Sequence, residues 1–221
     1  MKIERELKSY SKYNLISFDI FDTLIVRSVN NPKDVFYYAG SQVLLKQSEA
    51  LLFQKRRIEA ETVARQKSKT GEVNLKNIYS ELYKYYGIKA GILKESEERL
   101  ELQVCKPRNK WVSLFNAYVR EGKKVILISD MYLPSSHIKK ILSSCGIIGF
   151  AGLYISNEYG CDKVSGNLYK IVQERELCFD GLHLHYGDSF RADYLGARKA
   201  NVTPRFVFKE RWLYKLYHKL I

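Results

Sequence analysis

The sequence predicts an α/β protein in which a doubly wound parallel sheet carries a large, all-helical insertion. In the second half of the chain, short apolar runs alternate with segments of helical period, which is typical of a parallel sheet wrapped by helices on both faces. Between the first apolar run and this alternating half, the period is helical throughout. We therefore expect an α/β core formed by residues 1–30 and 112–221, and a helical insertion formed by residues 31–111.

The first strand and the insertion follow from this change in period. Residues 14–26 (NLISFDIFDTLIV) begin with a buried, β-prone run that ends at Asp19, where the apolar pattern breaks. Pro32, Gly71 and Gly87 then punctuate a series of amphipathic segments. These segments predict four helices, at residues 33–46, 48–67, 74–87 and 92–105.

The later elements alternate between the two types. Strands are expected at residues 123–129, 152–156, 182–188 and 205–208, and helices at residues 137–146, 167–175 and 192–200. Polar residues stand where several strands end: Asp19 after the first, Ser129 and Asp130 after the second, and Gly187 with Asp188 after a later one. The carboxyl ends of parallel strands share one edge of the sheet, where ligands bind. We therefore expect the functional site at this edge.

Composition and charge limit the class of protein. The chain has 221 residues, of which 46% are hydrophobic and 28% are charged, which fits a globular protein and excludes a disordered or fibrous chain. No apolar stretch approaches the roughly 20 residues that span a bilayer, and the first residues lack the apolar segment of a secretory signal, so a cytoplasmic protein is expected. The four cysteines are widely spaced and are expected to be reduced. A net charge of +13 predicts attraction to anions.

Four motifs, in order along the chain, resemble those of the haloacid dehalogenase (HAD) superfamily. They are FDIFDTL (residues 18–24), ILIS (126–129), Lys163 in CDKVSGNLY, and GDSFRAD (187–193). With ISDMYLP and the helical segment FQKRRIEAETVAR, they resemble more narrowly a bacterial subgroup associated with the biosynthesis of capsular and other surface polysaccharides. The resemblance covers nearly the whole chain. It implies a Rossmann-like HAD core, an Asp nucleophile, and a C1 cap formed by the helical insertion.

Asp19 is the predicted nucleophile. A carboxylate can attack phosphorus and form an aspartyl-phosphate, which divides one difficult hydrolysis into two displacements. Because the nucleophile and the phosphate are both anionic, Mg²⁺ held by oxygen ligands is needed to offset their repulsion. Asp188 is the expected second carboxylate ligand, and Asp193 would support the metal from nearby or through water. The resemblance adds the main-chain carbonyl of Phe21 as a metal ligand.

The phosphoryl group also needs hydrogen-bond donors for its remaining oxygens. Ser129 supplies a hydroxyl and Lys163 an ammonium, and Asp130 beside them is taken as a further substrate contact. Lys170 competes for the role of the lysine, but Lys163 is the one that matches the motif. Thr23, just after the strand, is expected to orient the nucleophile.

Phe21 departs from the family pattern. Most HAD phosphatases have at this position a second Asp, which protonates the leaving group and then activates water; here the nearest carboxylate is the next residue, Asp22. Three interpretations stay open: Asp22 reaches the site through a local distortion, water assists the leaving group, or the protein is not an efficient phosphatase. An aromatic residue here is also similar to the haloacid dehalogenases themselves. Those need no metal, whereas GDSFRAD keeps the acidic metal motif, so phosphoryl transfer is favoured.

Three charged residues of the second insertion helix, Arg57, Glu61 and Arg65, recur at every fourth position. Because they share a face with apolar residues, Arg57 and Glu61 are predicted to face the cleft and to bind the substrate. The alternative is an exposed ladder of ion pairs along the helix.

Two further features are interpreted mainly as packing. Residues 209–221 predict an amphipathic, basic helix that packs on its own domain or on a second copy in a homodimer. The alternative is peripheral contact with an anionic membrane or with a glycosyltransferase. His183 and His185 alternate along a strand and are expected to be core residues rather than metal ligands.

The resemblance thus implies a Mg²⁺-dependent phosphatase (phosphoric monoester hydrolase). It would act through an aspartyl-phosphate on a small phosphorylated sugar- or polyol-type precursor of a bacterial capsular or surface polysaccharide. The main alternative is a non-catalytic HAD module that binds an anionic partner or a glycosyltransferase. A haloacid dehalogenase or a nucleic-acid phosphatase is less favoured, since no nucleic-acid-binding motif is present and the basic residues are spread along the chain.

Overall fold

The core of the protein is a five-stranded parallel sheet, seen in a computed structural model that describes residues 3–178 and 182–209. The strand order is β5-β4-β1-β6-β7. The strands are β1 (Leu15–Phe18), β4 (Lys124–Ser129), β5 (Gly152–Ile155), β6 (His183–Gly187) and β7 (Thr203–Phe206). The central strand β1 pairs in parallel with both β4 and β6, so that Phe18 lies opposite Leu127 and Tyr186. The predicted fold class is therefore confirmed.

Helices cover both faces of this sheet. The core helices are α1 (Ile3–Ser9), α6 (Asn109–Arg120), α7 (Ser135–Ser144), α8 (Ser156–Tyr159), α9 (Asn167–Glu176), the wide π-type segment η1 (Phe190–Gly196) and α10 (Ala197–Lys199). Ile16 and Phe18 of β1 enter an apolar cluster with residues of α6 and α7, whereas Leu15 enters a second cluster with residues of α9 and α10. Successive side chains of a strand point to opposite faces, so β1 is buried on both sides.

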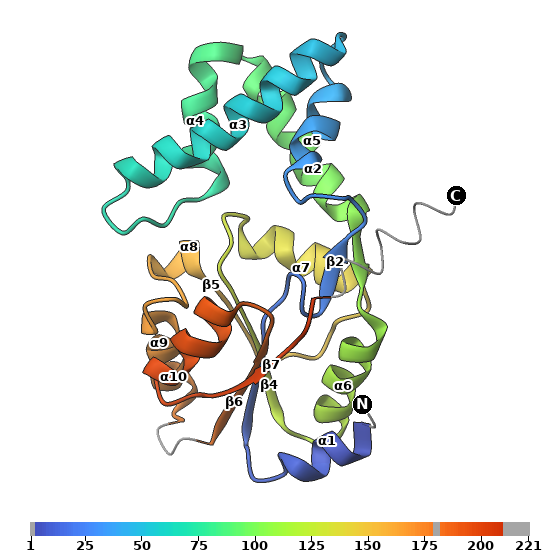
Figure 1. Ribbon diagram of the computed structural model, residues 1–221, viewed down its shortest axis with the longest axis vertical. Coiled ribbons are helices and arrows are strands. Elements are labelled where there is room, and N and C mark those ends of the chain that lie inside the picture. Colours follow the sequence, from blue (N-terminus) through green and yellow to red (C-terminus); the bar gives the residue numbers. More distant parts are fainter. Residues whose placement is uncertain (1–2, 179–181, 210–221) are drawn as a thin grey trace.

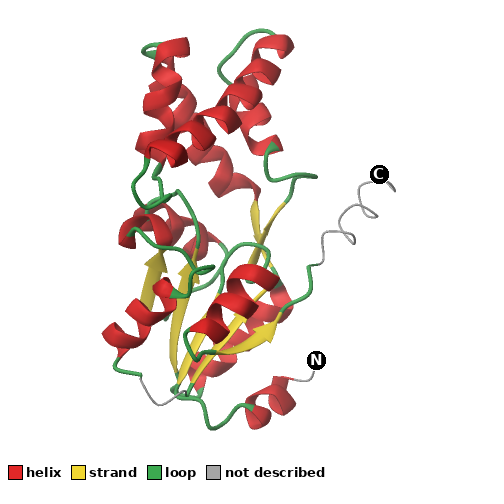
Figure 2. Ribbon diagram, turned by 60° about the vertical axis from the view of Figure 1, so that its left-hand side comes forward, coloured by secondary structure: helices red, strands yellow, loops and turns green. Residues whose placement is uncertain are grey.

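The insertion forms a helical layer, here called the cap, beyond one end of the sheet (Figures 1 and 2). Its helices are α2 (Asp34–Ser41), α3 (Gln47–Lys67), α4 (Leu75–Tyr86) and α5 (Lys89–Val104). The backbone N–H of Leu75 donates to the carbonyl of Tyr132, in the loop after β4, over 3.0 Å. The cap therefore sits at the carboxyl edge of the sheet, where the site is expected.

Two short antiparallel strands, β2 (Ile25–Arg27) and β3 (Cys105–Pro107), connect the cap to the core. They were not predicted, because strands of three residues are too short to show a period. The boundaries predicted for the cap, residues 31–111, stay a prediction, with α6 beginning at Asn109.

The structure differs from the sequence prediction at both ends of the core. The helix α1 was not predicted, and η1 begins at Phe190, ahead of the predicted residue 192. The predicted amphipathic helix at residues 209–221 lies outside the described residues except for Lys209. Within residues 3–178 and 182–209, no helix combines the length and the apolar character that crossing a membrane requires.

Candidate active site

Asp19 lies at the centre of the carboxyl edge of the sheet. It directly follows β1, and its backbone N–H donates to the carbonyl of Tyr186 on β6 over 2.8 Å. Only 6% of the residue is exposed. Ser129, the last residue of β4, is also buried at this edge. It lies on the side of β1 that faces β4, opposite to β6. The edge position predicted for Asp19 and Ser129 is thus the one that the sheet order produces.

Lys163 reaches Asp19 from the loop between α8 and α9. Its Nζ lies 2.6 Å from Asp19 Oδ1 and 2.5 Å from Asp193 Oδ1, and the residue is 3% exposed. Lys170, the competing lysine, lies exposed on α9. The Asp130 carboxylate accepts the backbone N–H of Lys163, with distances of 3.0 and 3.1 Å to its two oxygens. Asp130 therefore anchors the lysine loop, a role that the prediction of a substrate contact missed.

Two glycines, Gly187 at the end of β6 and Gly196 at the end of η1, allow Asp193 and Lys163 to pack closely against these two elements. A Cβ atom on Gly187, the last residue of β6, would lie 2.2 Å from Asp193 Cγ. A Cβ atom on Gly196 would lie 1.9 Å from the carbonyl oxygen of Lys163. Real atoms do not approach so closely, so any larger residue at either position would displace one member of the ion pair.

Asp188, directly after β6, is the second carboxylate at this edge. Its Oδ1 accepts a hydrogen bond from Thr23 Oγ1 over 3.2 Å. Its Oδ2 lies 2.8 Å from Nζ of Lys209, which follows β7. The Thr23 hydroxyl is thus directed to Asp188, and the role predicted for Thr23 in orienting the nucleophile stays a prediction. Lys209 was missed, although β7 ends at the same edge and so signals its position.

One oxygen each from Asp19, Asp188 and Asp193 lie within 4.8 Å of one another, and all three residues are buried. Asp193 has both oxygens engaged, since Oδ1 contacts Lys163 and Oδ2 accepts the Ser189 N–H over 2.8 Å. The donor set fits Mg²⁺, which prefers carboxylate oxygens, and the ammonium on Asp188 shows that this carboxylate accepts a cation. Asp19 and Asp188 would hold the metal, with Asp193 in support.

Burial and charge act in opposite directions on the buried ion pair. Burial raises the pKa of Asp19 well above its ordinary value, and Lys163 only partly offsets this rise. Burial alone would also raise the pKa of Asp193, but Lys163 and His185 together lower it. For Lys163, burial lowers the pKa, and the two carboxylates raise it to a net value well above the ordinary one. At neutral pH, Lys163 is therefore a fixed cation and Asp193 a fixed anion.

Asp22 adopts the local distortion that the sequence left open. Its φ is +62°, a left-handed conformation that is uncommon outside glycine, and its N–H donates to the Ile25 carbonyl over 2.7 Å. The guanidinium of Arg108 donates to the Asp22 carbonyl. Asp22 Oδ2 lies 3.7 Å from Lys209 Nζ, the ammonium that also contacts Asp188. The turn thus brings the Asp22 carboxylate to the border of the site.

Phe21 stands between Asp19 and Asp22 in the sequence of this loop. Its ring packs under the guanidinium of Arg27 at 4.2 Å, so the side chain at the position of the usual acid is held by a cation–π contact. The role of its main-chain carbonyl as a metal ligand stays a prediction.

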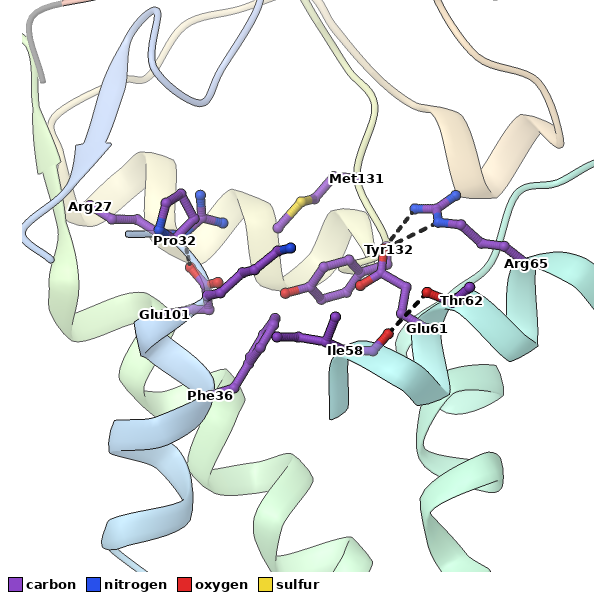
Figure 3. A pocket seen from close by; sticks show the side chains of 11 residues that line it. Arg27, Pro32, Phe36, Ile58, Glu61, Thr62, Arg65, Glu101, Met131 and Tyr132 are labelled. Atoms are coloured by element: carbon purple, nitrogen blue, oxygen red, sulfur yellow. Dashed lines mark hydrogen bonds and ion pairs between the residues drawn. The ribbon is translucent and has the colours of Figure 1, made fainter. Parts of the chain in front are cut away.

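A cavity of about 370 Å³ lies between the cap and the core. Figure 3 shows Tyr132, from the loop after β4, between the ion pairs Arg27–Glu101 and Arg65–Glu61. The other residues that line the cavity are Pro32, Lys33, Phe36, Ile58, Thr62 and Met131. The predicted substrate contact Glu61 therefore lines a cavity at the interface of the cap with the core.

Arg57, the other predicted substrate contact, has a different position. It is fully buried where the cap meets the core loop after β4, and its Nε and Nη2 donate to the two carboxylate oxygens of Glu97 over 2.8 and 2.9 Å. Its Nη1 donates to Glu61 over 3.1 Å. The structure does not expose Arg57 to the cleft: the rings of Phe36 and Tyr132, which line the cavity, lie 4.3 and 4.7 Å from its guanidinium, and each of its nitrogens donates to a carboxylate. Arg57 is a structural residue that holds α3 against α5.

Comparison with known proteins agrees with this geometry at the level of the fold. No family model and no curated protein sequence matches the chain. Among solved structures, the chain is similar to the HAD-hydrolase YfnB from Bacillus subtilis, determined with bound magnesium, with 17% identity and a TM-score of 0.60 over 93% of this chain and 99% of that one. The HAD family enzyme BT-2542 from Bacteroides thetaiotaomicron has 13% identity and a TM-score of 0.63 over 93% and 98%.

A 2-haloacid dehalogenase from Pseudomonas syringae is similar to the same extent. It has 16% identity and a TM-score of 0.63 over 86% of this chain and 84% of that one. At such identities, these similarities show that the chain has the HAD fold, as its motifs predict.

Proposed function

We propose that the protein is a Mg²⁺-dependent phosphatase that acts through an aspartyl-phosphate on a small phosphorylated sugar- or polyol-type compound. The observation that carries the proposal is a buried Asp19, held by Lys163 and facing a second buried carboxylate, Asp188, at the carboxyl edge of a HAD-type sheet. The three carboxylates Asp19, Asp188 and Asp193 outnumber the two ammonium groups that contact them, those of Lys163 and Lys209, and this excess of negative charge favours a further cation at the site.

The contacts of Asp19 support its Oδ2 as the attacking atom. Lys163 occupies Asp19 Oδ1, so Oδ2 is the oxygen that bonds to phosphorus while the ester oxygen leaves. Water then attacks the phosphorus of the acyl phosphate and regenerates the carboxylate. Lys163 and the Ser129 hydroxyl bind the phosphoryl oxygens as charge develops. When bound at Asp19 and Asp188, Mg²⁺ supplies positive charge that offsets the repulsion between carboxylate and phosphate.

The substrate class rests on the motif resemblance and on the size of the cap cavity. The resemblance implies a precursor of a bacterial capsular or surface polysaccharide. A cavity of about 370 Å³ lined by aromatic rings, carboxylates, two arginines and a lysine suits a small ring-shaped leaving group with hydroxyls. A screen of sugar and polyol phosphates, with and without Mg²⁺, tests this proposal. Release of phosphate from none of them would reject it.

Two observations keep other functions in view. Phe21 stands where a phosphatase usually has its acid, which favours a non-catalytic module that binds an anionic partner or a glycosyltransferase. The similarity to 2-haloacid dehalogenase structures adds dehalogenation as a candidate. Chloride release from 2-haloacids without metal would support a dehalogenase. Binding of phosphate esters without turnover would support the module, and salt-sensitive binding of oligonucleotides would support a nucleic-acid phosphatase.

Replacing Asp188 tests the metal site. Asp188→Asn is expected to lower phosphatase activity and to shift the Mg²⁺ dependence to higher concentrations, because an amide is a weaker ligand for Mg²⁺ than a carboxylate. The stabilisation of the wild type by Mg²⁺, measured as a rise in Tm, should shrink in the variant. The matched control is Asp34→Asn, at the start of the cap helix α2, which should leave both responses unchanged. Equal Mg²⁺ dependence in Asp188→Asn and wild type would contradict the ligand role.

Replacing Asp22 tests whether it replaces the missing acid. Asp22→Asn is expected to slow hydrolysis of alkyl phosphates by about 10²- to 10⁴-fold, the usual contribution of a positioned acid or base. Nitrophenyl phosphate should be affected much less, because nitrophenolate leaves without a proton. The measurement is the ratio of kcat/KM for the two substrates. If both fall equally, Asp22 acts only through the fold of its turn; if neither falls, it has no role in the chemistry.

A further inference from the structure

Three polar side chains lie in the middle of the sheet, on the face covered by α9. They are Ser17 of β1 and His183 and His185 of β6, and we call them the β1–β6 relay. All three are fully buried. The register pairs Ser17 with His185, directly behind the site residues that end the two strands. Buried polar groups in a sheet core destabilise a protein unless each is hydrogen-bonded, so their contacts are informative.

The relay ends on the active site. Ser17 Oγ lies 2.6 Å from His183 Nε2 and 2.8 Å from His185 Nδ1. His185 Nε2 lies 3.1 Å from Asp193 Oδ1, the same oxygen that contacts Lys163. A continuous series of hydrogen bonds therefore runs from the interior of β6 to the ion pair that holds the nucleophile.

The contacts fix the direction of these bonds. The Asp193 carboxylate can only accept, so His185 carries its proton on Nε2, and its Nδ1 must accept from a donor. The only donor at His185 Nδ1 among residues 3–178 and 182–209 is the Ser17 hydroxyl, whose oxygen then accepts the Nε2–H of His183. The Leu184 carbonyl, 3.5 Å from Ser17 Oγ, is a more distant acceptor for this hydroxyl than His185 Nδ1 at 2.8 Å. In this arrangement His183 Nδ1 is an unprotonated acceptor. No polar partner lies near that atom within the described chain, which agrees with this assignment.

The reverse direction is unfavourable. If Ser17 donated to His183, the proton of His183 would be on Nδ1, a buried donor without an acceptor. His185 would then direct an unprotonated Nε2 at a carboxylate or carry a second proton in the core. Both rings are neutral in the favoured arrangement, and burial lowers the pKa of His183 to about 3 and that of His185 in the same direction.

We infer that the β1–β6 relay holds the Asp193 carboxylate against Lys163, and so keeps the Lys163 ammonium in place on Asp19. Its members are positioning residues, since none of them is placed against the reacting atoms. Every donor in the relay is directed toward Asp193, and hydrogen bonds aligned in one direction strengthen one another. The ring of Tyr169 packs edge-on against His185, with centroids 5.0 Å apart, which fixes the orientation of the imidazole. The effect on turnover rests on the proposed function, but the relay itself does not.

The direction of the relay is measurable in the unmodified protein. Long-range ¹H–¹⁵N correlation spectra of the full chain, labelled on histidine, report which ring nitrogen carries the proton. Resonances are assigned by their loss in His183→Gln and His185→Gln. Both rings are expected to be neutral and protonated on Nε2 near neutral pH. Protonation of either ring on Nδ1 would overturn the inference, whether or not the protein is a phosphatase.

Ser17→Ala tests the positioning role. It removes the hydroxyl that joins the two rings, so kcat is expected to fall by about 10- to 100-fold, as for outer partners of a catalytic centre, with KM unchanged. Ser96→Ala is the matched control, because Ser96 is equally buried but donates to Ala39 within the cap, and its kcat should stay at the wild-type value. Equal kcat in the two variants would overturn the positioning role.

An NMR measurement tests the relay even if the protein shows no phosphatase activity, so that no kcat can be measured. In Ser17→Ala, the ¹⁵N resonance of His185 Nδ1 should move downfield, since the atom loses its hydrogen-bond donor. An unmoved resonance would overturn the relay even if no phosphatase activity is found. If Ser17→Ala does not fold, the wild-type tautomers decide the question.

Discussion

Asp19→Asn is expected to lower kcat by about 10⁴-fold or more, because an amide cannot form the acyl phosphate. The fold should stay intact, and Tm at neutral pH should be unchanged or higher. The reason is that burial raises the pKa of Asp19, so its charge is disfavoured in the folded protein. When the pKa of a carboxyl group is higher in the folded than in the unfolded state, the protein loses stability as the pH rises from the unfolded-state pKa through the folded-state pKa. The amide removes this loss. Steady-state kinetics and thermal unfolding across pH measure both effects.

The control for this variant is Asp34→Asn, in which the same chemical change is made at the start of α2, in the cap. It should keep the wild-type kcat. Activity retained in Asp19→Asn would show that the nucleophile is misassigned. A large fall in Tm would instead mean that the ionised carboxylate is part of the fold, and that its pKa is not raised as burial predicts.

The strand ends were the part of the site that the sequence could predict. Asp19, Ser129 and Asp188 each follow a buried apolar run, and parallel strands bring their carboxyl ends to one edge whatever the order of the strands. The fold class follows from the same alternation. The partners of the side chains could not be predicted in this way. Thr23 lies in a loop with a left-handed residue, Asp22, and the conformation of this loop directs the Thr23 hydroxyl to Asp188.

Helical period likewise locates a face without saying what covers it. Arg57 shares one side of α3 with apolar residues. This pattern is expected for a side that faces a cleft, and equally for a side that is buried by other helices. The deciding residue, Glu97, comes 40 positions later on α5 and forms a bidentate ion pair that no local pattern predicts. The alternation of His183 and His185 along β6 predicts that both are core residues, and both are fully buried. Their contact through Ser17 depends on the register of β1 with β6, which pairs Ser17 with His185.

Lys163→Met is expected to have the largest effect on stability, a loss of about 3–5 kcal/mol in the free energy of unfolding, the usual result of removing one partner from a buried ion pair. Met keeps a side chain of similar length, so the loss reports charge rather than a cavity. Without the ammonium, Asp19 and Asp193 face each other as uncompensated buried carboxylates. Chemical denaturation at neutral pH measures the change.

Two comparisons separate charge from packing in this variant. Lys170→Met, on the exposed face of α9, should change the free energy of unfolding little, because solvent screens that charge. Adding Asp193→Asn to Lys163→Met should restore part of the lost stability, since one of the two facing charges is removed. The deficit of Lys163→Met should also be smaller at mildly acidic pH, where a carboxylate with a raised pKa takes up a proton. A deficit that is the same at all pH values and in the double variant would mean that Lys163 stabilises the site by packing alone.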